Sequence, residues 1–157
     1  MVELIAGKLV FIAWAFAIPA LYHRWWVVLL AYAGTTFLVG FILSVVFQLA
    51  HCVEDAGFPE VPRETDRAPH GWAVHQVETT IDFAPRNALL TWYLGGLNFQ
   101  IEHHLFPRIC HVHYPAIAPV VQSVCAAFGI RYRCHPSLVS AMSSHWRWLR
   151  RMGRSSE

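Results

Sequence analysis

The chain has 157 residues, of which 55% are hydrophobic and 14% are charged. Together with a mean hydropathy of +0.37, this balance excludes an ordinary soluble domain, and the length leaves room for one domain. The formal net charge is only +2, but the charges are unevenly distributed along the chain.

The first fifty residues predict a transmembrane helical hairpin. No charged residue occurs between Leu9 and Tyr22 or between Trp25 and Val53, and the second stretch is long enough to cross ~30 Å of hydrocarbon. The first stretch reaches full length if Lys8 extends toward the headgroups. We place the spans at about residues 4–22 and 25–50. A cleaved signal peptide is the alternative, but there is no basic leader and a second span follows at once.

Residues 51–157 predict a helical cap at the membrane surface. Residues 57–71 carry three prolines among five charges and read as a surface loop. Apolar periodicity and Gly or Pro boundaries then predict helices over residues 72–82, 88–94, 97–106, 115–129 and 136–151, with a short extended piece at 130–134. The predicted fold class is therefore an all-α integral membrane protein with one hairpin and a cap.

The last quarter of the chain is basic. Its arginines are interleaved with Trp146, Trp148, Leu149 and Met152, a pattern that suits a helix on anionic lipid better than nucleic-acid binding. The positive-inside tendency places the cap in the cytoplasm. The six arginines are Arg131, Arg133, Arg147, Arg150, Arg151 and Arg154. The four cysteines show no CxxC spacing, which predicts free, reduced thiols.

The run QIEHHLFP carries three potential metal ligands on one helical face. Gln100, His103 and His104 fall within an arc of about 100°, so they project toward a single point. Two adjacent imidazoles in an apolar helix need partners if they are buried, which favours metal binding. Glu102 points about 200° away from Gln100 and is expected to meet solvent or an arginine.

His51 ends the second predicted span and is a further candidate ligand. Gln48 lies on its face, and Glu54 and Asp55, one turn later, could accept the ring N–H that does not bind metal. A histidine that reaches from the bilayer edge to water is the alternative, and both remain open.

The remaining histidines predict weaker roles. His75 is either an outer-shell residue of a metal site or has no role there. Of the other six, His111 and His113 are expected as loop or outer-shell residues and the rest in solvent. These six are His23, His70, His111, His113, His135 and His145. No GxSxG, GxxxxGK or HExxH motif occurs, which excludes three common catalytic classes. Zinc held by His51, His103 and His104 stays open, although no Cys pair supports it.

Three segments together resemble a known family. QLAH at 48–51, WAVHQVETTIDF at 72–83 and GGLNFQIEHHLFPRICHVHYP at 95–115 resemble the C-terminal part of a membrane fatty acid desaturase. The resemblance is to the branch whose third histidine box reads QxxHH, which includes front-end acyl desaturases and bacterial acyl-CoA or acyl-lipid desaturases. It runs from about the hairpin to Tyr132.

The resemblance implies an oxygen-dependent, non-haem di-iron site on the cytoplasmic face. Its ligands here would be His51, Gln100, His103 and His104, and its reaction would place a double bond in an acyl chain of an acyl-CoA or acyl-lipid. Cytochrome b5 or ferredoxin would deliver the electrons.

The chain departs from that family in one respect. It contains neither the HxxxH box nor the HxxHH box, and it has one hairpin where the family has two. We therefore expect a truncated or split gene product that is inactive without a separate N-terminal half. Two alternatives remain: a non-catalytic membrane remnant that binds metal or a partner, and a hydroxylase on the same scaffold.

Overall fold

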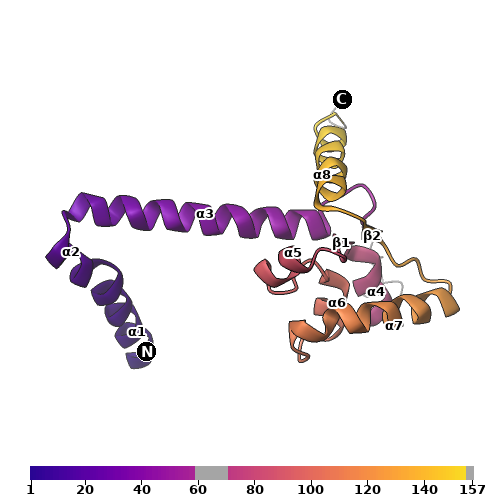
Figure 1. Ribbon diagram of the computed structural model, residues 1–157, viewed down its shortest axis with the longest axis horizontal. Coiled ribbons are helices and arrows are strands. Elements are labelled where there is room, and N and C mark those ends of the chain that lie inside the picture. The colour runs from indigo at the N-terminus through magenta and orange to yellow at the C-terminus, as the bar shows by residue number, and fades with distance from the viewer. Residues whose placement is uncertain (59–70, 155–157) are drawn as a thin grey trace. The chain divides into compact units, whose positions relative to one another are not determined.

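The computed structural model describes residues 1–58 and 71–154 (Figure 1). It contains two compact units, residues 1–44 and 45–157, and each is described by itself. The predicted surface loop at 57–71, with its prolines and His70, lies almost entirely outside the described residues.

The chain contains two apolar helices long enough to cross a membrane, and the first unit holds the first helix and the second helix up to residue 44. One runs from Val2 to Tyr22 and the other is α3 (Trp25–His51), with mean hydropathies of 2.0 and 2.1. The first helix begins two residues before the expected start and consists of three parts: α1 (Val2–Ile12), a π-helical turn (Ala13–Ala17) and α2 (Ile18–Tyr22). The turn comes just before Pro19, which cannot donate a helical hydrogen bond.

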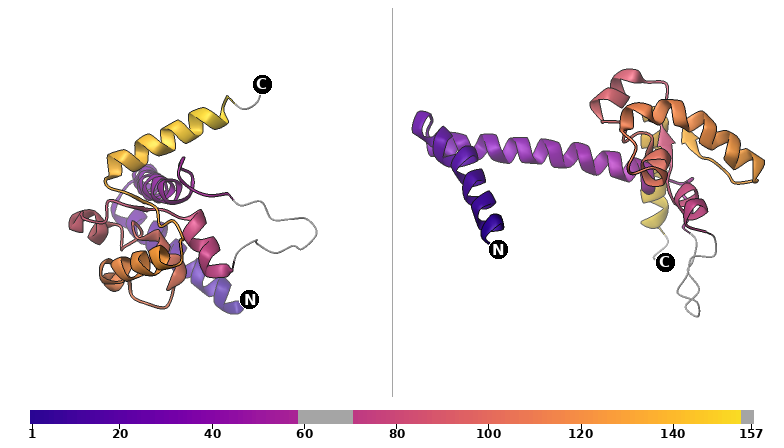
Figure 2. Two further views of the ribbon diagram at one scale, coloured as in Figure 1. Left: turned by 90° about the vertical axis from the view of Figure 1, so that its right-hand side faces the viewer. Right: turned by 90° about the horizontal axis from the view of Figure 1, so that it is seen from below.

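The hairpin contacts are concentrated near its turn. The ring of Tyr32 lies 4.7 Å from that of Phe16 and 6.1 Å from that of Phe11, measured between centroids. Beyond this cluster α1 diverges from the first part of α3, as two views show (Figure 1; Figure 2, right). The two predicted spans are thus both helical, but within the first unit α1 does not run alongside the first part of α3.

The second unit carries short helices and one pair of strands. After α3 come α4 (Trp72–Thr79), β1 (Asp82–Phe83), α5 (Ala88–Tyr93), α6 (Gln100–Leu105), a 3₁₀ turn (His111–His113), α7 (Tyr114–Ala127), β2 (Cys134–His135) and α8 (Leu138–Met152). β1 and β2 are parallel, with Asp82 opposite Cys134. This pair was not expected in an all-α fold. It also explains why α4 ends at Thr79 rather than at 82.

The core of the second unit lies between α4, α6 and α7. Val77, Ile101, Val121 and Cys125 form one buried cluster, and each is at most 7% exposed. Burial of such a side chain stabilises the fold by about 1.5–3 kcal/mol. The cluster therefore fixes α6 between its two neighbours.

Glycines set the boundary of α6. Gly95 and Gly96 have φ of +58° and +76°, which L side chains rarely adopt. A Cβ on Gly96 would lie 2.8 Å from the Cβ of His111. The predicted helix over 97–106 therefore starts later, at Gln100, because residues 94–99 form the turn.

The last two helices follow their sequence signals. Gly129 has φ +68° and lies just after α7, where the N–H of Ile130 bonds the carbonyl of Cys125 at 2.8 Å. The side chain of Ser137 accepts a hydrogen bond from the N–H of Ser140 and begins α8 two residues after the predicted start.

Candidate metal site

Two imidazoles converge on one amide in the second unit. His51 ends α3, and Gln100 and His104 lie at either end of α6. The amide nitrogen of Gln100 lies 3.4 Å from Nε2 of His51 and 3.3 Å from Nε2 of His104. The two rings are 5.2 Å apart. Residues separated by 49 positions in the chain thus face one point.

The last turns of α4 orient both rings. Nδ1 of His104 lies 2.7 Å from Oε1 of Gln76, and a hydrogen bond links the ring of His51 to the backbone of Thr79. An amide oxygen only accepts, so Nδ1 of His104 donates and its Nε2 keeps a lone pair. Burial, and then the neighbouring His51 and His103, lower the pKa of His104. The ring is therefore held neutral, the form that binds metals.

Gln100 is almost fully buried, and one of its amide atoms has no partner. Its exposed fraction is 1%, and Oε1 makes no hydrogen bond within the described part of the chain. Buried polar atoms are nearly always satisfied, so an unsatisfied one suggests a missing ligand. A half-turn of the amide would point Oε1 at the two ring nitrogens. Imidazole nitrogens are suitable ligands for iron, zinc, copper and nickel, and an amide oxygen could be a further ligand beside them.

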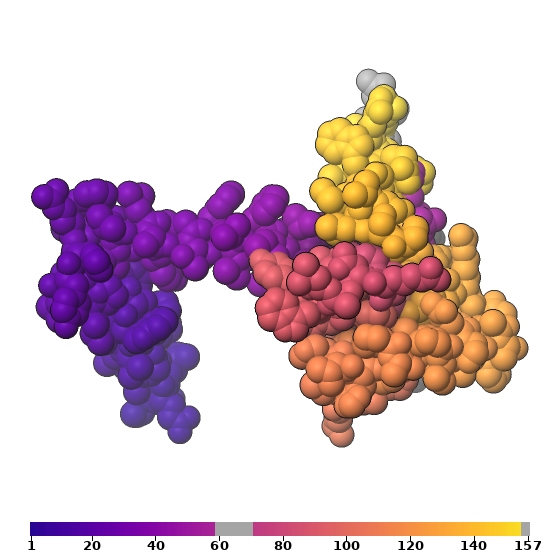
Figure 3. Space-filling view, viewed as in Figure 1, coloured from indigo at the N-terminus to yellow at the C-terminus, as the bar shows by residue number. Residues whose placement is uncertain are grey.

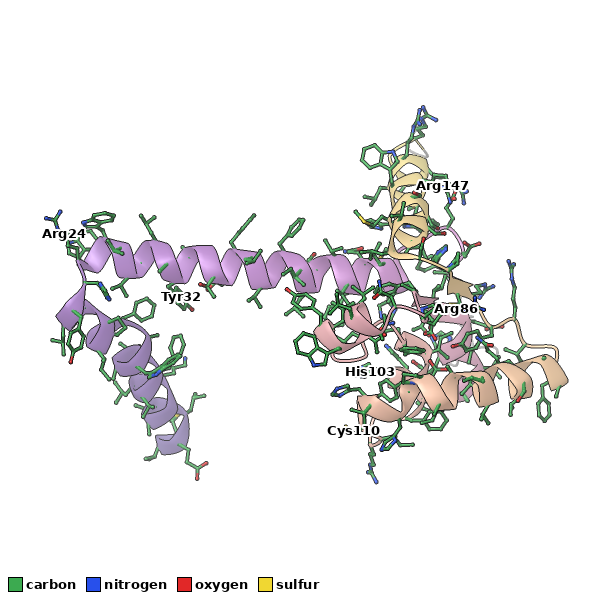
Figure 4. The ribbon with its side chains drawn as sticks, viewed as in Figure 1. Arg24, Tyr32, Arg86, His103, Cys110 and Arg147 are labelled. Atoms are coloured by element: carbon green, nitrogen blue, oxygen red, sulfur yellow. The ribbon has the colours of Figure 1, made fainter. Side chains whose placement is uncertain are left out.

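His103 lies apart from this convergence. Its ring is 5.8 Å from that of His104 and 6.4 Å from that of Tyr114, at the start of α7 (Figure 4). Among the described contacts, none joins it to His51 or Gln100. No group of three or more His, Cys, Asp or Glu residues within 1–58 and 71–154 is arranged to hold a metal ion. The structure thus brings together three of the four predicted ligands, and the full set stays a prediction.

Glu54 and Asp55 were expected to accept a hydrogen bond from the ring of His51, but their described contacts are with other residues. Glu54 instead accepts hydrogen bonds from Arg147 at 2.5 Å and Arg151 at 2.6 Å. Asp55 lies 3.7 Å from Nε2 of His135. The cause is that α3 ends at His51, so these carboxylates no longer follow its face. Thr79 and Gln76 hold the rings instead.

Glu102 was expected to meet solvent or an arginine, but it is buried and its described side-chain partners include no arginine. Its exposed fraction is 0%. The hydroxyl of Tyr132 donates to Asp82 and lies 3.1 Å from Oε1 of Glu102, while Oδ1 of Asp82 accepts the N–H of Ile101 at 2.9 Å. Burial raises the pKa of Asp82 well above its usual value, and the neighbouring Glu102 adds to this. Burial also raises the pKa of Glu102.

Two other histidines also differ from expectation. His135 is 7% exposed and lies between Ser140 and Asp55, while Nδ1 of His145 is 2.6 Å from the carbonyl of Cys52. His23 is exposed as predicted, and His111 and His113 lie in an exposed 3₁₀ turn, as expected for loop residues. Nδ1 of His75 is buried without a partner in the described residues, which leaves its role open. All four cysteines are free thiols, as predicted.

Comparison with known proteins decides the family. The model of the fatty acid desaturase family matches residues 1–136. The chain belongs to this family. It is 45% identical over 118 residues to an sn-1 linoleoyl-lipid 6-desaturase of Arthrospira platensis, covering 75% of this chain and 32% of the relative. It is 41% identical over 149 residues to an acyl-lipid (8-3)-desaturase of Physcomitrium patens, covering 94% of this chain and 31% of the relative.

The match to a third relative is longer. An sn-1 linoleoyl-lipid 6-desaturase of Synechocystis is 36% identical over 157 residues, covering 99% of this chain and 44% of the relative. The chain thus spans less than half the length of these curated desaturases. No solved structure matches it.

Within this member of the family, sequence reasoning missed four residues that contact the candidate site or α6: Gln76, Thr79, Asp82 and Tyr132. The first three belong to the segment WAVHQVETTIDF, one of the three that carried the resemblance. That segment was therefore a usable signal, although only the fold shows which contacts its polar residues make.

Proposed function

We propose that this chain is the C-terminal part of an oxygen-dependent, non-haem di-iron desaturase that introduces a double bond into the acyl chain of an acyl-CoA or acyl-lipid. One observation carries the proposal: Nε2 of His51 and Nε2 of His104 face the same buried amide from two separate helices. Family membership and two apolar helices support a membrane location for this chemistry.

The donors present fit part of such a centre. His51 and His104 would bind through Nε2 and Gln100 through Oε1, with His103 as the fourth ligand. These residues alone are too few to enclose two irons. We infer that the remaining ligands come from a separate N-terminal half with HxxxH and HxxHH boxes. Iron held by the ligands of both halves together would supply the oxygen activation that removes hydrogen from unactivated methylenes.

The residues of this chain would position and insulate the ligands. Gln76 holds His104 in one tautomer, and the lowered pKa of His104 keeps its ring neutral. Outer-shell partners of this kind typically change metal affinity 10–100-fold when they are removed. Asp82 and Tyr132 brace α6 from its other side. On this proposal the second unit faces the cytoplasm and receives electrons from cytochrome b5 or ferredoxin.

The proposal is tested by co-expression. The chain is produced in membranes alone and together with an N-terminal desaturase half, and iron content and fatty-acid unsaturation are measured. We expect new double bonds only when both parts are present, and no activity when His104 is replaced by Ala. His113→Ala, in an exposed turn, is the matched control and should leave activity unchanged.

Three outcomes would change the assignment. Desaturation by the chain alone would contradict the need for a second half. A chain that binds no iron in either setting, with no effect of His104→Ala, would indicate a non-catalytic membrane remnant. Hydroxylated rather than unsaturated products would indicate the sibling reaction on this scaffold.

A further inference from the structure

We propose that α8 is a binding surface for the headgroups of anionic phospholipids at the edge of the bilayer. The proposal depends on the two apolar helices lying in a membrane. It does not depend on iron binding or on desaturation, so it can fail or succeed independently of the proposed function.

One side of α8 carries an exposed apolar stripe. Its members recur three or four residues apart and are between 49% and 72% exposed: Val139, Met142, Trp146, Leu149 and Met152. Another side packs inward through Ala141 and Ser144, which are both 0% exposed. The stripe is therefore not the side by which α8 joins the described protein, and helix periodicity makes it a continuous apolar strip.

Arginines occur beside this stripe. Arg147, Arg150, Arg151 and Arg154 line, with Glu54, a surface hollow of about 560 Å³. Glu54 bonds Arg147 and Arg151, and within the described residues no ion pair is formed by Arg150 or Arg154. Four guanidinium groups around one carboxylate leave an excess of positive charge. Guanidinium groups bind phosphate oxygens in a bidentate way, which favours a phosphate-bearing ligand.

The contacts of α8 place this surface at the end of the long apolar helix. Ser144 accepts the N–H of Glu54 at 3.1 Å, and His145 bonds the carbonyl of Cys52 at 2.6 Å. Arg147 points from α8 toward the segment that follows α3 (Figure 4). Because Glu54 comes three residues after α3 ends, the arginines that it binds are expected near the level where hydrocarbon gives way to headgroups.

The combination of features selects one class of partner. Figure 3 shows one face of α8, which projects beyond its neighbours in the second unit. A helix with an apolar stripe beside arginines binds in the bilayer interface, where the stripe meets acyl chains and the arginines meet phosphates. A nucleic acid or a free phosphate would satisfy the arginines but would leave the stripe in water. We therefore assign the surface to anionic lipid.

The test measures how deeply Trp146 enters the bilayer. The full chain is reconstituted in nanodiscs of phosphatidylcholine with or without phosphatidylglycerol, and brominated lipids quench tryptophan fluorescence. Subtracting the quenching of Trp146→Phe isolates this residue from the other six tryptophans. We expect Trp146 to be quenched in nanodiscs that contain phosphatidylglycerol and much less in phosphatidylcholine alone.

Charge variants provide the second arm. The double variant Arg150→Gln/Arg154→Gln should weaken the preference for phosphatidylglycerol about 25-fold, since each arginine near an anionic surface contributes about fivefold. Arg108→Gln/Arg131→Gln removes the same charge at exposed positions outside α8 and should leave the preference unchanged.

Clear results would overturn the proposal. Trp146 that is not quenched with either lipid would mean that water or protein covers the stripe. Equal quenching with both lipids, unchanged in the double variant, would mean that no anionic headgroup is recognised. Loss of the preference in both double variants would mean that total charge, rather than α8, is responsible.

Discussion

Two acidic residues of the second unit link distant segments in opposite surroundings. Asp82 is 1% exposed and joins β1 to α6 and to Tyr132, with no cation among its described partners. Glu54 lies at the surface and joins the segment after α3 to α8 through Arg147 and Arg151. The linkage through Asp82 is a buried hydrogen-bond network, and the linkage through Glu54 consists of two exposed ion pairs.

The difference shows how surroundings decide what a carboxyl group contributes. Burial raises the pKa of Asp82, so this group is favoured in its neutral form. The hydrogen bond from Arg147 lowers the pKa of Glu54, so this group is charged. Buried networks are costly to break because their remaining members cannot turn to water, whereas exposed pairs contribute little. We therefore expect stability to depend on Asp82 far more than on Glu54.

The largest effect is expected from Asp82→Ala. The N–H of Ile101 and the hydroxyl of Tyr132 would lose their acceptor inside the protein, which should lower the free energy of unfolding by about 3 kcal/mol. Asp82→Asn keeps an acceptor for Ile101 and resembles a neutral Asp, so it should cost about 1 kcal/mol or less. Chemical unfolding of the full chain in detergent measures both. A loss in Asp82→Ala as small as that expected for Asp82→Asn would show that Asp82 does not brace α6.

Tyr132→Phe should have the next largest effect. It removes the hydroxyl that donates to Asp82 and lies near Glu102 but keeps the ring in the core, and we expect a loss of about 1–2 kcal/mol. Tyr114→Phe is the control, because its ring is buried but its hydroxyl has no described hydrogen bond within 1–58 and 71–154. If the two variants lose the same free energy of unfolding in this assay, the hydrogen bonds of the Tyr132 hydroxyl do not stabilise the fold.

Local sequence signals predicted most helices and part of the candidate site. Apolar periodicity, Gly129 and Ser137 act within a few residues, so the ends of α7 and the start of α8 were close to expectation. The same periodicity predicted that Gln100 and His104 project together, and their side chains do meet. Their role as ligands stays a prediction.

Long-range partners could not be predicted in this way. A helical wheel showed that Glu102 points away from Gln100, but not that Asp82 and Tyr132 lie on that side. Tyr132 is 50 residues from Asp82, and the two meet only because β1 pairs with β2. The partners of Glu54 are more than 90 residues away in the chain. Such contacts follow from the packing of whole elements, which residue spacing does not encode.

The two acids should respond to pH in opposite directions. The folded-state pKa of Asp82 lies above its usual value of 3.8, so the stability that it contributes is greatest below that value and falls as the pH rises toward the folded pKa. The folded-state pKa of Glu54 lies below 4.5, so its contribution is present above that value and is lost as the pH falls. Unfolding of Asp82→Asn and Glu54→Gln across pH, each compared with the parent chain, measures the two slopes. Slopes of the same sign would contradict the comparison.

The smallest effect on stability is expected from Glu54→Gln. It breaks two exposed ion pairs with Arg147 and Arg151, and solvent and salt already screen most of their energy. The melting temperature should fall less than in Tyr132→Phe, and the difference from the parent chain should vanish at high salt. A large fall in melting temperature in Glu54→Gln that does not depend on salt would mean that the contact between α8 and the end of α3 is part of the core. The contrast between the buried network of Asp82 and the exposed ion pairs of Glu54 would then fail.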